Sequence, residues 1–529
     1  MLHLCVAFLH FMNKPLIERL LDYYHIDYRD YLKLVEPKDL TNFAAGHQFD
    51  DIGKAVQLVK DIIAKKGKII IYGDYDADGV MGTSILVKMF QYLNVVVDYY
   101  LPSRYLDGYG INMKHAQEYI DQKYDLVITV DNGITANEPI ELLHNNGVKA
   151  LILDHHQVGD EIPHADAICH PTYSHFGEIA SSGAFTAFMF SIALLGRVDK
   201  YLATLASVSL ISDMMPLLDY NRNLLRAVFK AYRHGEFLAL DLLGDNEPFN
   251  ESLVGMKIAP RINSIGRLTE DESINKIVEY FVSDNKEFIL NYHAYILEMN
   301  ESRKQISKID VDDFRIDESA KAIVVNGDYK EGIIGLVANS LMMKYRVPVI
   351  VFSSPTDGII KGSGRCPEGC DIVDIFSHLS DLIITSGGHS LAGGCSIKEE
   401  DFEIFKKRFI EYAKSIVYVK PEHQSIDLGI NELNMENYEL ITSFGPFGES
   451  WIAPLFKLKR IRVDSLMYSR DHKHIITSIG NRQKLVCFNY HPEELENSTY
   501  VDAIGTISKK TFMHNTYLEF SIKEFKKSN

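Results

Sequence analysis

The stretch Ile69–Ser84 reads Ile-Ile-Ile-Tyr-Gly-Asp-Tyr-Asp-Ala-Asp-Gly-Val-Met-Gly-Thr-Ser, and the rest of the chain is organised around it. Its β-branched opening predicts a fully buried strand. Asp74, Asp76 and Asp78 follow in alternation after the strand. Open α/β sheets place their ligand sites at the carboxyl ends of strands, so these carboxylates stand where a site is expected.

Three carboxylates in one turn are costly to ionise together unless a cation shares them. We therefore expect a divalent-metal site, although an Asp/Gly-rich surface turn with solvated charges is the simpler alternative. The pattern also resembles the start of a calcium loop, but no acidic residue closes a loop of about twelve residues, as such a loop requires. Gly79 and Gly82 are expected to let the backbone turn tightly into a helix over 84–90.

Further strands are predicted over 95–101, 125–130 and 150–153, and they alternate with helical stretches. This alternation predicts a parallel, doubly wound sheet, so the fold class is α/β. Asp131 follows the second of these strands, and the triplet Asp154-His155-His156 follows the third. Carboxylate and imidazole ligands together suit manganese better than calcium, and magnesium is the alternative.

Asp213 is the only charged residue in the apolar segment 205–217. A lone carboxylate there is either a helix cap or a buried group that needs a partner. A metal shared with the strand-end residues would satisfy it.

The composition describes an ordinary globular protein of several domains. The chain has 529 residues, 46% hydrophobic and 24% charged, and exceeds the size of one core. Its six cysteines include no CxxC pair, which favours a reducing compartment without structural zinc or disulfides. The net charge of −17 argues against nucleic-acid binding unless a local basic cleft or bound metal ions supply positive charge.

The opening segment Met1–Met12 is apolar, but it lacks a basic start and a cleavage site and is too short to span a bilayer. A signal peptide is therefore disfavoured, and Met12 is an alternative natural start. We expect a cytoplasmic protein without a membrane association.

Several motifs together resemble the DHH phosphoesterase superfamily, and within it the single-strand-specific 5′ to 3′ DNA exonucleases. The resemblance extends from about residue 50 to the end of the chain. Its motifs are Asp74-Tyr-Asp76-Ala-Asp78-Gly, Val130-Asp131-Asn-Gly, Asp154-His155-His156, Ser212-Asp213-Met-Met-Pro, Pro102-Ser-Arg104, Ala259-Pro-Arg261-Ile-Asn263-Ser-Ile-Gly266-Arg267, Glu331-Gly-Ile-Ile-Gly335, Gly362-Ser363-Gly364-Arg365 and Gly387-Gly388-His389.

This resemblance implies a role for each motif residue. We expect two ions, Mn²⁺ or Mg²⁺, to be held by Asp76, Asp78, Asp131, His155 and Asp213. Catalytic residues that ligate the ions or orient their ligands are Asp74, Asp154 and His156. Backbone phosphates would be bound by Arg104, Arg261, Arg267, Ser363, Arg365 and His389.

The sequence also departs from the family pattern. Tyr72 stands where the family often has His, Met81 where it has Thr, and Ser209-Leu210 replaces a usual Gly-Thr. Near the C-terminal end, Ser450-Trp451-Ile452 replaces Gly-Asn-Pro. None of these changes removes a residue of metal-ligand type, so they affect loop detail more than the class of reaction.

The domain organisation follows from the motifs and from changes in texture along the chain. We expect an N-terminal helical segment over 1–50, a DHH catalytic domain over 51–268, connecting helices over 269–318, an α/β DHH-associated domain over 319–418 and a C-terminal domain over 419–529. In the second domain, 362–365 and 387–389 are expected to be short glycine-rich turns beside the substrate.

Short alternating runs after residue 420 suggest a small barrel, and the resemblance implies an OB-fold β-barrel. Such barrels bind single strands through aromatic stacking and a basic groove. Candidates for base stacking are Phe488, Tyr490, Phe512 and Tyr517, although for each residue taken alone a core position is favoured over a stacking role.

We therefore predict a metal-dependent exonuclease that hydrolyses single-stranded DNA 5′ to 3′ in repair and recombination. Alternatives are a phosphodiesterase for oligonucleotides or cyclic dinucleotides, a family pyrophosphatase, or a catalytically silent single-strand-binding scaffold. The expected partners are single-stranded DNA, a single-strand-binding protein and a helicase. The chain is expected to be a monomer.

Overall fold

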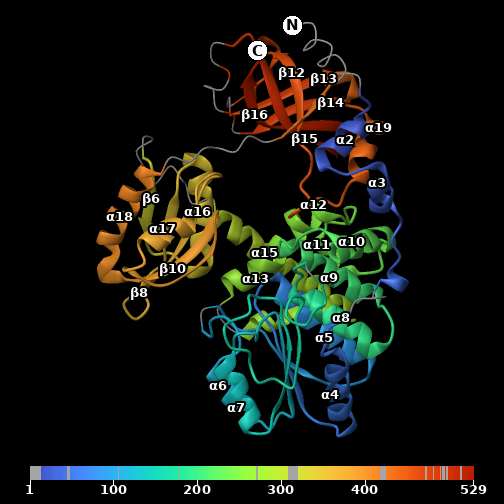
Figure 1. Cartoon of the computed structure of the whole chain (residues 1–529), viewed down its shortest axis with the longest axis vertical. Coiled ribbons are helices and arrows are strands. Elements are labelled where there is room, and N and C mark those ends of the chain that lie inside the picture. Colours follow the sequence, from blue (N-terminus) through green and yellow to red (C-terminus); the bar gives the residue numbers. More distant parts are fainter. Residues whose placement is uncertain are drawn as a thin grey trace. The chain divides into compact units, whose positions relative to one another are not determined.

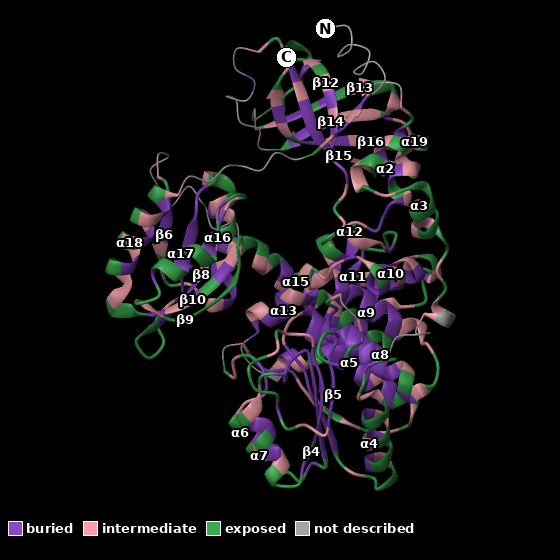
Figure 2. Cartoon of the chain, viewed as in Figure 1, coloured by how far each residue is buried: buried purple, intermediate pink, exposed green. Residues whose placement is uncertain are grey.

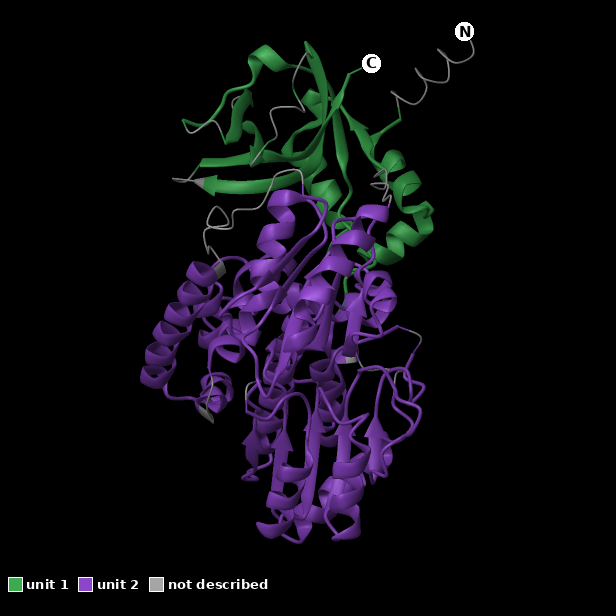
Figure 3. Ribbon diagram, turned by 90° about the vertical axis from the view of Figure 1, so that its left-hand side faces the viewer, with its two compact units in different colours: residues 1–38, 422–529 green, residues 39–421 purple. Residues whose placement is uncertain are grey.

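The computed structural model describes residues 14–528, except for 44–47, 105, 178, 270–271, 308–319, 417–423, 471–472, 481, 489, 491–494, 496–497 and 513–514. The apolar segment 1–12 considered above lies outside the described residues. Two compact units make up the chain, one of residues 1–38 with 422–529 and one of residues 39–421 (Figure 3). Among the described residues, no helix has both the length and the apolar character needed to cross a bilayer.

The first sheet of the 39–421 unit has five strands, all parallel, in the order β2-β1-β3-β4-β5. The strands are β1 (Ile69–Tyr72), β2 (Asp98–Tyr100), β3 (Leu126–Val130), β4 (Lys149–Leu153) and β5 (Ala167–Cys169). The order reverses between β1 and β3, and ligand sites of open α/β sheets lie at such a switch point. The predicted doubly wound parallel sheet is confirmed.

Helices cover both faces of this sheet, which is why its strands are apolar on both sides. The helices on one face are α6 (Met113–Asp121) and α7 (Asn137–Asn145), and those on the other are α4 (Ile52–Ala64), α5 (Ala77–Tyr92) and α8 (Gly183–Leu195). Figure 2 shows the buried residues concentrated in the strands and in α5 and α8. Helix α5 is buried around most of its circumference, as a central helix must be.

Gly79 and Gly82 of the opening stretch do not form the tight turn that we predicted from the sequence. Helix α5 already begins at Ala77, so Gly79 and Gly82 lie inside it. A Cβ on Gly79 would come within 2.5 Å of the Asp74 backbone, and one on Gly82 within 2.5 Å of Cγ2 of Val130. The glycines therefore bring α5 close to the loop after β1 and to the end of β3.

A group of helices follows the first sheet and leads to the second domain (Figure 1). It consists of α9 (Lys200–Ser212), α10 (Asp219–Ala231), α11 (Leu238–Leu243), α12 (Glu251–Leu253), a π-helical turn (Val254–Ile258), α13 (Ala259–Leu268), α14 (Lys276–Val282) and α15 (Lys286–Ser307). The long helix α15 lies within the segment 269–318 that we expect to connect the two domains, and the domain boundaries themselves stay a prediction.

The second sheet is mixed and has the strand order β6-β7-β8-β10-β9. Its elements are β6 (Ile323–Asn326), α16 (Glu331–Tyr345), β7 (Val349–Phe352), β8 (Ile359–Arg365), α17 (Ile372–His378), β9 (Ile383–His389), β10 (Ala392–Lys398) and α18 (Phe402–Ser415). The predicted second α/β domain is therefore present.

The glycine-rich motifs of this domain lie in strands and not in the turns that we predicted. Residues 362–365 belong to β8 and residues 387–389 to β9. A Cβ on Gly362 would lie 2.6 Å from the ring of Phe352, and one on Gly364 would lie 2.7 Å from Ile372. Glycine in these strands makes room for the side chains that pack over the sheet.

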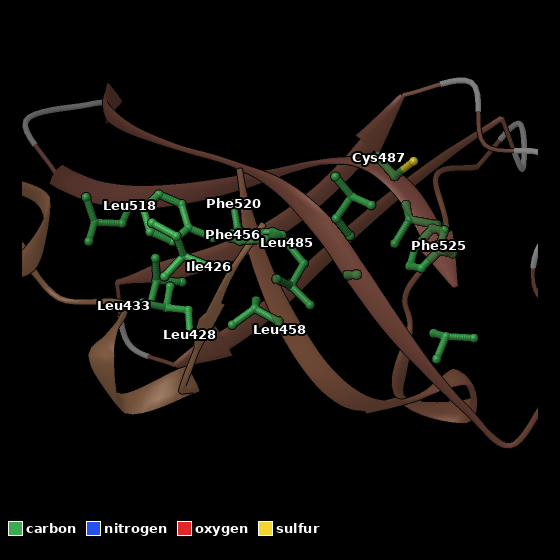
Figure 4. Close-up of a cluster of buried hydrophobic side chains, with 14 of the residues drawn as sticks. Ile426, Leu428, Leu433, Phe456, Leu458, Leu485, Cys487, Leu518, Phe520 and Phe525 are labelled. Carbon is green, nitrogen blue, oxygen red and sulfur yellow. The ribbon is translucent and has the colours of Figure 1, made fainter. Parts of the chain in front are cut away.

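The unit of residues 1–38 and 422–529 contains a six-stranded sheet in the order β11-β12-β15-β16-β14-β13. Its elements are α2 (Leu16–Tyr24), α3 (Tyr28–Val35), β11 (Ile426–Leu428), α19 (Met435–Ser443), β12 (Phe456–Arg462), β13 (His474–Gly480), β14 (Gln483–Phe488), β15 (Tyr500–Phe512) and β16 (Asn515–Lys527). Figure 4 shows the apolar core between the strands, including Phe456, Leu485 and Phe520.

The N-terminal helix α2 contributes to this core, which the sequence does not indicate. Leu16 and Leu20 are buried against residues of the C-terminal strands. Arg19 pairs with Glu432 and donates to the carbonyl of Asp427. The first and last parts of the chain therefore fold together as one unit.

Candidate metal centre

The loop after β1 places three carboxylates between the first sheet and two helix N-termini. Asp76 caps α5, since its Oδ1 accepts a hydrogen bond from the backbone N–H of Asp78 at 2.9 Å. Asp78 accepts from the N–H groups of Gly183 and Ala184, both at 2.7 Å, at the start of α8. Asp74 and Asp78 are buried. Because helix N-termini favour negative charge, these contacts hold two of the carboxylates in place.

Asp131, His155 and Asp213 come from three other segments and meet the first loop. Nε2 of His155 lies 3.0 Å from Oδ1 of Asp131, 3.5 Å from Oδ2 of Asp78 and 3.5 Å from Oδ2 of Asp213. Asp131 follows β3 in a left-handed conformation with φ of 64°, and Asp213 caps the C-terminal end of α9. Strain of this kind at a strand end is typical of functional sites.

Asp154 and His156 form a hydrogen-bonded pair beside this group. Oδ1 of Asp154 lies 2.9 Å from Nδ1 of His156, and its Oδ2 accepts from the N–H of Ile134 at 2.9 Å. Burial raises the pKa of Asp154, but the bonds from His156 and Ile134 outweigh it and bring the pKa to about 2. Burial lowers the pKa of His156, but Asp154 outweighs it and raises the pKa to about 9. Asp154 is thus a fixed anion that orients His156.

Four other carboxyl groups, those of Asp74, Asp76, Asp131 and Asp213, are held in surroundings that favour protonation. Burial, and then repulsion from neighbouring carboxylates, raises the pKa of Asp74, Asp76 and Asp131, and raises that of Asp213 to about 8. Oδ1 of Asp74 and Oδ2 of Asp213 are buried without a hydrogen-bond partner. Unpaired buried oxygens and mutually repelling carboxylates are what bound cations would stabilise.

Three overlapping sets of side chains have ligand atoms that all lie within 4.8 Å of one another. They are Asp131 with His155 and His156, Asp78 with His155 and Asp213, and Asp74 with Asp76 and Asp131. Every predicted metal or catalytic residue except Asp154 belongs to one of these sets. Oxygen ligands with one or two imidazoles fit Mn²⁺ or Mg²⁺.

Several arginines lie near the carboxylates of the candidate metal centre, which we call the acidic group. The guanidinium of Arg104 stacks over the ring of Tyr75 at 4.2 Å, and its charge offsets part of the rise in the pKa of Asp74 and Asp76 that burial causes. Arg267 donates to the carbonyl of Gly332 at 3.3 Å, at the start of α16. Burial, followed by the charges of Arg104 and another arginine, lowers the pKa of Arg267 to about 10. Like-charged arginines held together favour an anionic ligand.

The second sheet contributes Ser363 and Arg365 from β8. Nη1 of Arg365 donates to Oγ of Ser363 at 3.0 Å, and burial lowers the pKa of Arg365. A Cβ on Gly335 in α16 would lie 2.9 Å from Nη2 of Arg365, so glycine there admits the guanidinium. Repulsion from Arg365 also contributes to the lowered pKa of Arg267, which joins this pair to the arginines above.

Two of the predicted phosphate-binding residues are placed differently. Arg261 forms a two-pronged ion pair with Asp245 at 2.9 and 3.0 Å and donates to the carbonyl of Leu243 at 2.6 Å. Its guanidinium is therefore engaged within its own helical group. His389 lies at the exposed end of β9.

Three residues of this site were not singled out from the sequence. Tyr109 donates its hydroxyl to the carbonyl of Asp131 at 3.2 Å and lies 3.0 Å from Nδ1 of His156. The side-chain amide of Asn132 donates to the carbonyls of Gly73 and Val130, both at 3.0 Å, and joins the ends of β1 and β3. Asn263 accepts from the N–H of Ala77 at 2.8 Å and fixes the start of α5.

A signal for Tyr109 was present, because it stands between Gly108 and Gly110, whose φ values are 78° and 75°. A tyrosine between two left-handed glycines marks a shaped loop. The two asparagines stand within the quoted motifs, but the sequence gives them no role, because the bonds to Gly73 and Ala77 reach other segments.

Three family profiles match the chain in succession. Residues 68–210 match the DHH family N-terminal domain, residues 318–415 the DHHA1 domain and residues 426–524 the RecJ OB domain. These matches cover the first sheet, the second sheet and the C-terminal β domain described above.

Individual proteins resemble most of the chain. The single-stranded-DNA-specific exonuclease RecJ of Bacillus subtilis is 28% identical over 538 aligned residues, covering 96% of this chain and 68% of that protein. A crystal structure of exonuclease RecJ bound to manganese is 29% identical and covers 70% of this chain and 96% of that chain, with a TM-score of 0.60. The structure of RecJ in complex with Mn²⁺ from Thermus thermophilus matches in fold over 98% of this chain and 78% of that chain, with a TM-score of 0.81 and 24% identity.

Proposed function

Because this chain belongs to the DHH family, with a C-terminal OB domain of the RecJ type, we propose that it is a metal-dependent exonuclease that hydrolyses single-stranded DNA. One observation supports this proposal above the others. Acidic and imidazole side chains from four separate segments meet at the switch point of the first sheet, next to buried arginines. That arrangement suits a phosphodiester, which is an anion cleaved at a metal centre.

The proposed metal ligands are Asp76, Asp78, Asp131, His155 and Asp213, with Asp74 completing a third set. Two divalent ions bound there would activate a water molecule and stabilise the charge of the attacking and leaving oxygens. Asp154 holds His156 through the 2.9 Å hydrogen bond, and Asp78 is held by the N-terminus of α8. No serine or cysteine nucleophile is required.

We further propose that the arginines orient the DNA backbone. Arg104 and Arg267 lie beside the acidic group, while Arg365 and Ser363 project from the second sheet. A clamp on a terminal 5′ phosphate would make digestion start at that end and proceed 5′ to 3′. The sequence prediction of a single-strand-binding protein and a helicase as partners stays a prediction.

The test is digestion of a long oligonucleotide labelled at either end, with and without a 5′ phosphate, in Mn²⁺ or Mg²⁺. We expect 5′-terminal nucleotides to be released first, duplex DNA to be spared, and chelation to stop the reaction. Asp131→Ala should reduce the rate by more than about a hundredfold, since even outer residues of metal sites cost up to that much.

The matched control is Asp160→Ala, in the exposed loop after the neighbouring strand β4, which should leave the rate unchanged. Hydrolysis by Asp131→Ala at the wild-type rate would show that the metal assignment is wrong. Digestion of di- or trinucleotides in preference to long strands would favour the short-oligonucleotide alternative.

A further inference from the structure

Two cysteines lie at the ends of the turn 366–370, which joins β8 to α17. The Sγ atoms of Cys366 and Cys370 are 3.2 Å apart, and both are free thiols. Both side chains are buried, with 2% and 4% of the residue exposed. Because a disulfide has an S–S distance of about 2.05 Å, closing the bond requires a movement of only about 1 Å.

The two thiols are not chemically equivalent. The contact with Cys366, together with a hydrogen bond from the backbone N–H of Asp371, lowers the pKa of Cys370. The same contact and burial raise the pKa of Cys366. The thiolate is the reactive form of cysteine, so Cys370 is the residue that an oxidant would meet first.

We propose that Cys366 and Cys370 form a reversible disulfide when the protein meets hydrogen peroxide. The Cys370 thiolate attacks one oxygen of the peroxide, the O–O bond breaks, and Cys370 sulfenic acid and hydroxide are produced. The Cys366 sulfur then attacks the sulfenic sulfur, and the S–O bond breaks with release of water after proton transfer. Overall, two thiols and one peroxide give one disulfide and two waters. Because the two thiols are buried, a small oxidant such as hydrogen peroxide reaches them more easily than a bulky disulfide does.

The turn is connected to β8, which carries the proposed phosphate-binding residues Ser363 and Arg365, and to the end of β9. Cys366 directly follows Arg365 in the chain, and its N–H donates to the carbonyl of Leu391 at 3.0 Å. The N–H of Ile372 donates to the carbonyl of Ser390 at 2.8 Å, next to His389. Contraction of the turn would therefore shift the ends of β8 and β9.

This second step rests on the proposed function. A shift of about 1 Å in residues that position a substrate can reduce turnover up to about a hundredfold. We expect a weaker effect on binding, a rise in KM for single-stranded DNA of about tenfold, because the metal centre itself is untouched.

The experiment treats the full chain, freed of metal by chelation, with hydrogen peroxide, removes the peroxide with catalase, and divides the sample. One part is alkylated and digested for mass spectrometry, and the other receives Mn²⁺ and is assayed on single-stranded DNA. We expect one peptide pair linked through Cys366 and Cys370, and a raised KM. Reduction with dithiothreitol should separate the two peptides and return KM to its untreated value.

The variants Cys366→Ser and Cys370→Ser should keep their KM after peroxide. The control Cys395→Ser removes a buried free cysteine of β10 and should remain as sensitive as the wild type. Thiols that stay alkylatable, or that reach sulfinic acid without a linked peptide, would overturn the proposal. A linked peptide with an unchanged KM would overturn the effect on the substrate, whereas an untreated enzyme without nuclease activity would overturn the proposed function alone.

Discussion

Nε2 of His155 lies 3.0 Å from Oδ1 of Asp131, and this contact joins the ends of the adjacent parallel strands β3 and β4. Asp131 and His155 share one set of candidate metal ligands, and each also belongs to a second set that the other does not enter. At this contact an imidazole joins the mutually repelling carboxylates, and together these side chains form a candidate site for cations.

The first prediction concerns the stability of the metal-free protein. The pKa of Asp213 is raised to about 8 by burial and by Asp78 and Asp76. Between pH 4 and 8 the carboxyl group of Asp213 is ionised in the unfolded chain but stays protonated in the folded chain. Unfolding therefore becomes more favourable as the pH rises. Asp213→Asn should therefore raise the Tm of the metal-free protein at pH 8 and leave it unchanged at pH 4.

Thermal unfolding with and without Mn²⁺ measures this effect. Mn²⁺ should stabilise the wild type, because it binds the folded state only, and should stabilise Asp213→Asn much less. A variant that is less stable than the wild type without metal at pH 8 would contradict the prediction.

The second prediction separates two arginines that the sequence placed in the same role. Arg365→Gln should raise KM for 5′-phosphorylated single-stranded DNA about ten- to a hundredfold, the worth of a hydrogen bond to a charged group. Arg261→Gln should leave KM unchanged and lower the Tm, because Arg261 is engaged by Asp245. Steady-state kinetics and thermal melts of both variants decide this, and the reverse pattern would restore Arg261 to the substrate site.

The third prediction concerns Tyr109, whose hydroxyl contacts the carbonyl of Asp131 and Nδ1 of His156. Tyr109→Phe removes both contacts and keeps the ring. We expect kcat to fall about tenfold with a smaller change in KM, because the loss loosens a ligand-orienting contact. Tyr173→Phe, at an exposed tyrosine, is the matched control. Equal kcat values for the two variants would exclude a positioning role for Tyr109.

The fourth prediction tests the close approach of α5 to β3. Gly82→Ala would place a methyl group 2.5 Å from Cγ2 of Val130. It should cost about 1–3 kcal/mol of stability, as overpacking does. Gly53→Ala, in α4 with open space around the glycine, should instead be neutral or stabilising by up to about 1 kcal/mol. Urea unfolding of both variants provides the measurement, and adding Val130→Ala to Gly82→Ala should recover part of the loss.

The fifth prediction uses Trp451, the only tryptophan in the chain, as a reporter. Trp451 stacks on Tyr24 of α2 with ring centroids 4.5 Å apart, so its fluorescence follows the unfolding of the unit that α2 and the C-terminal strands share. Leu20→Ala should lower the stability seen by this signal by about 2–5 kcal/mol. Leu32→Ala, at an exposed position of α3, should change it little. Identical unfolding midpoints for the wild type and Leu20→Ala would mean that α2 does not contribute to this core.

Two departures from the family pattern, Tyr72 and Trp451, find local explanations in the structure. Tyr72 is buried and donates its hydroxyl to the carbonyl of Gly110 at 3.1 Å, which fixes the loop that carries Tyr109. Trp451 donates its indole N–H to the carbonyl of Phe444 at 2.8 Å. Tyr72 thus supports a loop of the metal centre, whereas Trp451 fixes a loop within the C-terminal unit, and every residue of metal-ligand type stays in place.

The sequence alone determined the buried strands of the first sheet and the chemistry of their ends. The apolar runs before Asp74, Asp131 and Asp154 predicted buried parallel strands, because a strand that is buried on both faces has a continuous run of apolar residues. Carboxylate and imidazole residues at those ends predicted a metal site, because ligand preference is a property of each side chain.

Only the tertiary structure decided which of these residues meet and which find other partners. Arg261 and Arg365 look alike in sequence, yet one pairs with Asp245 and the other with Ser363. Gly82 was expected to form a turn, but the nearness of Val130 gives it a packing role inside a helix. Helix α2 joins strands from the opposite end of the chain. Such contacts depend on distances between segments that are remote along the chain, and local patterns of residues do not record those distances.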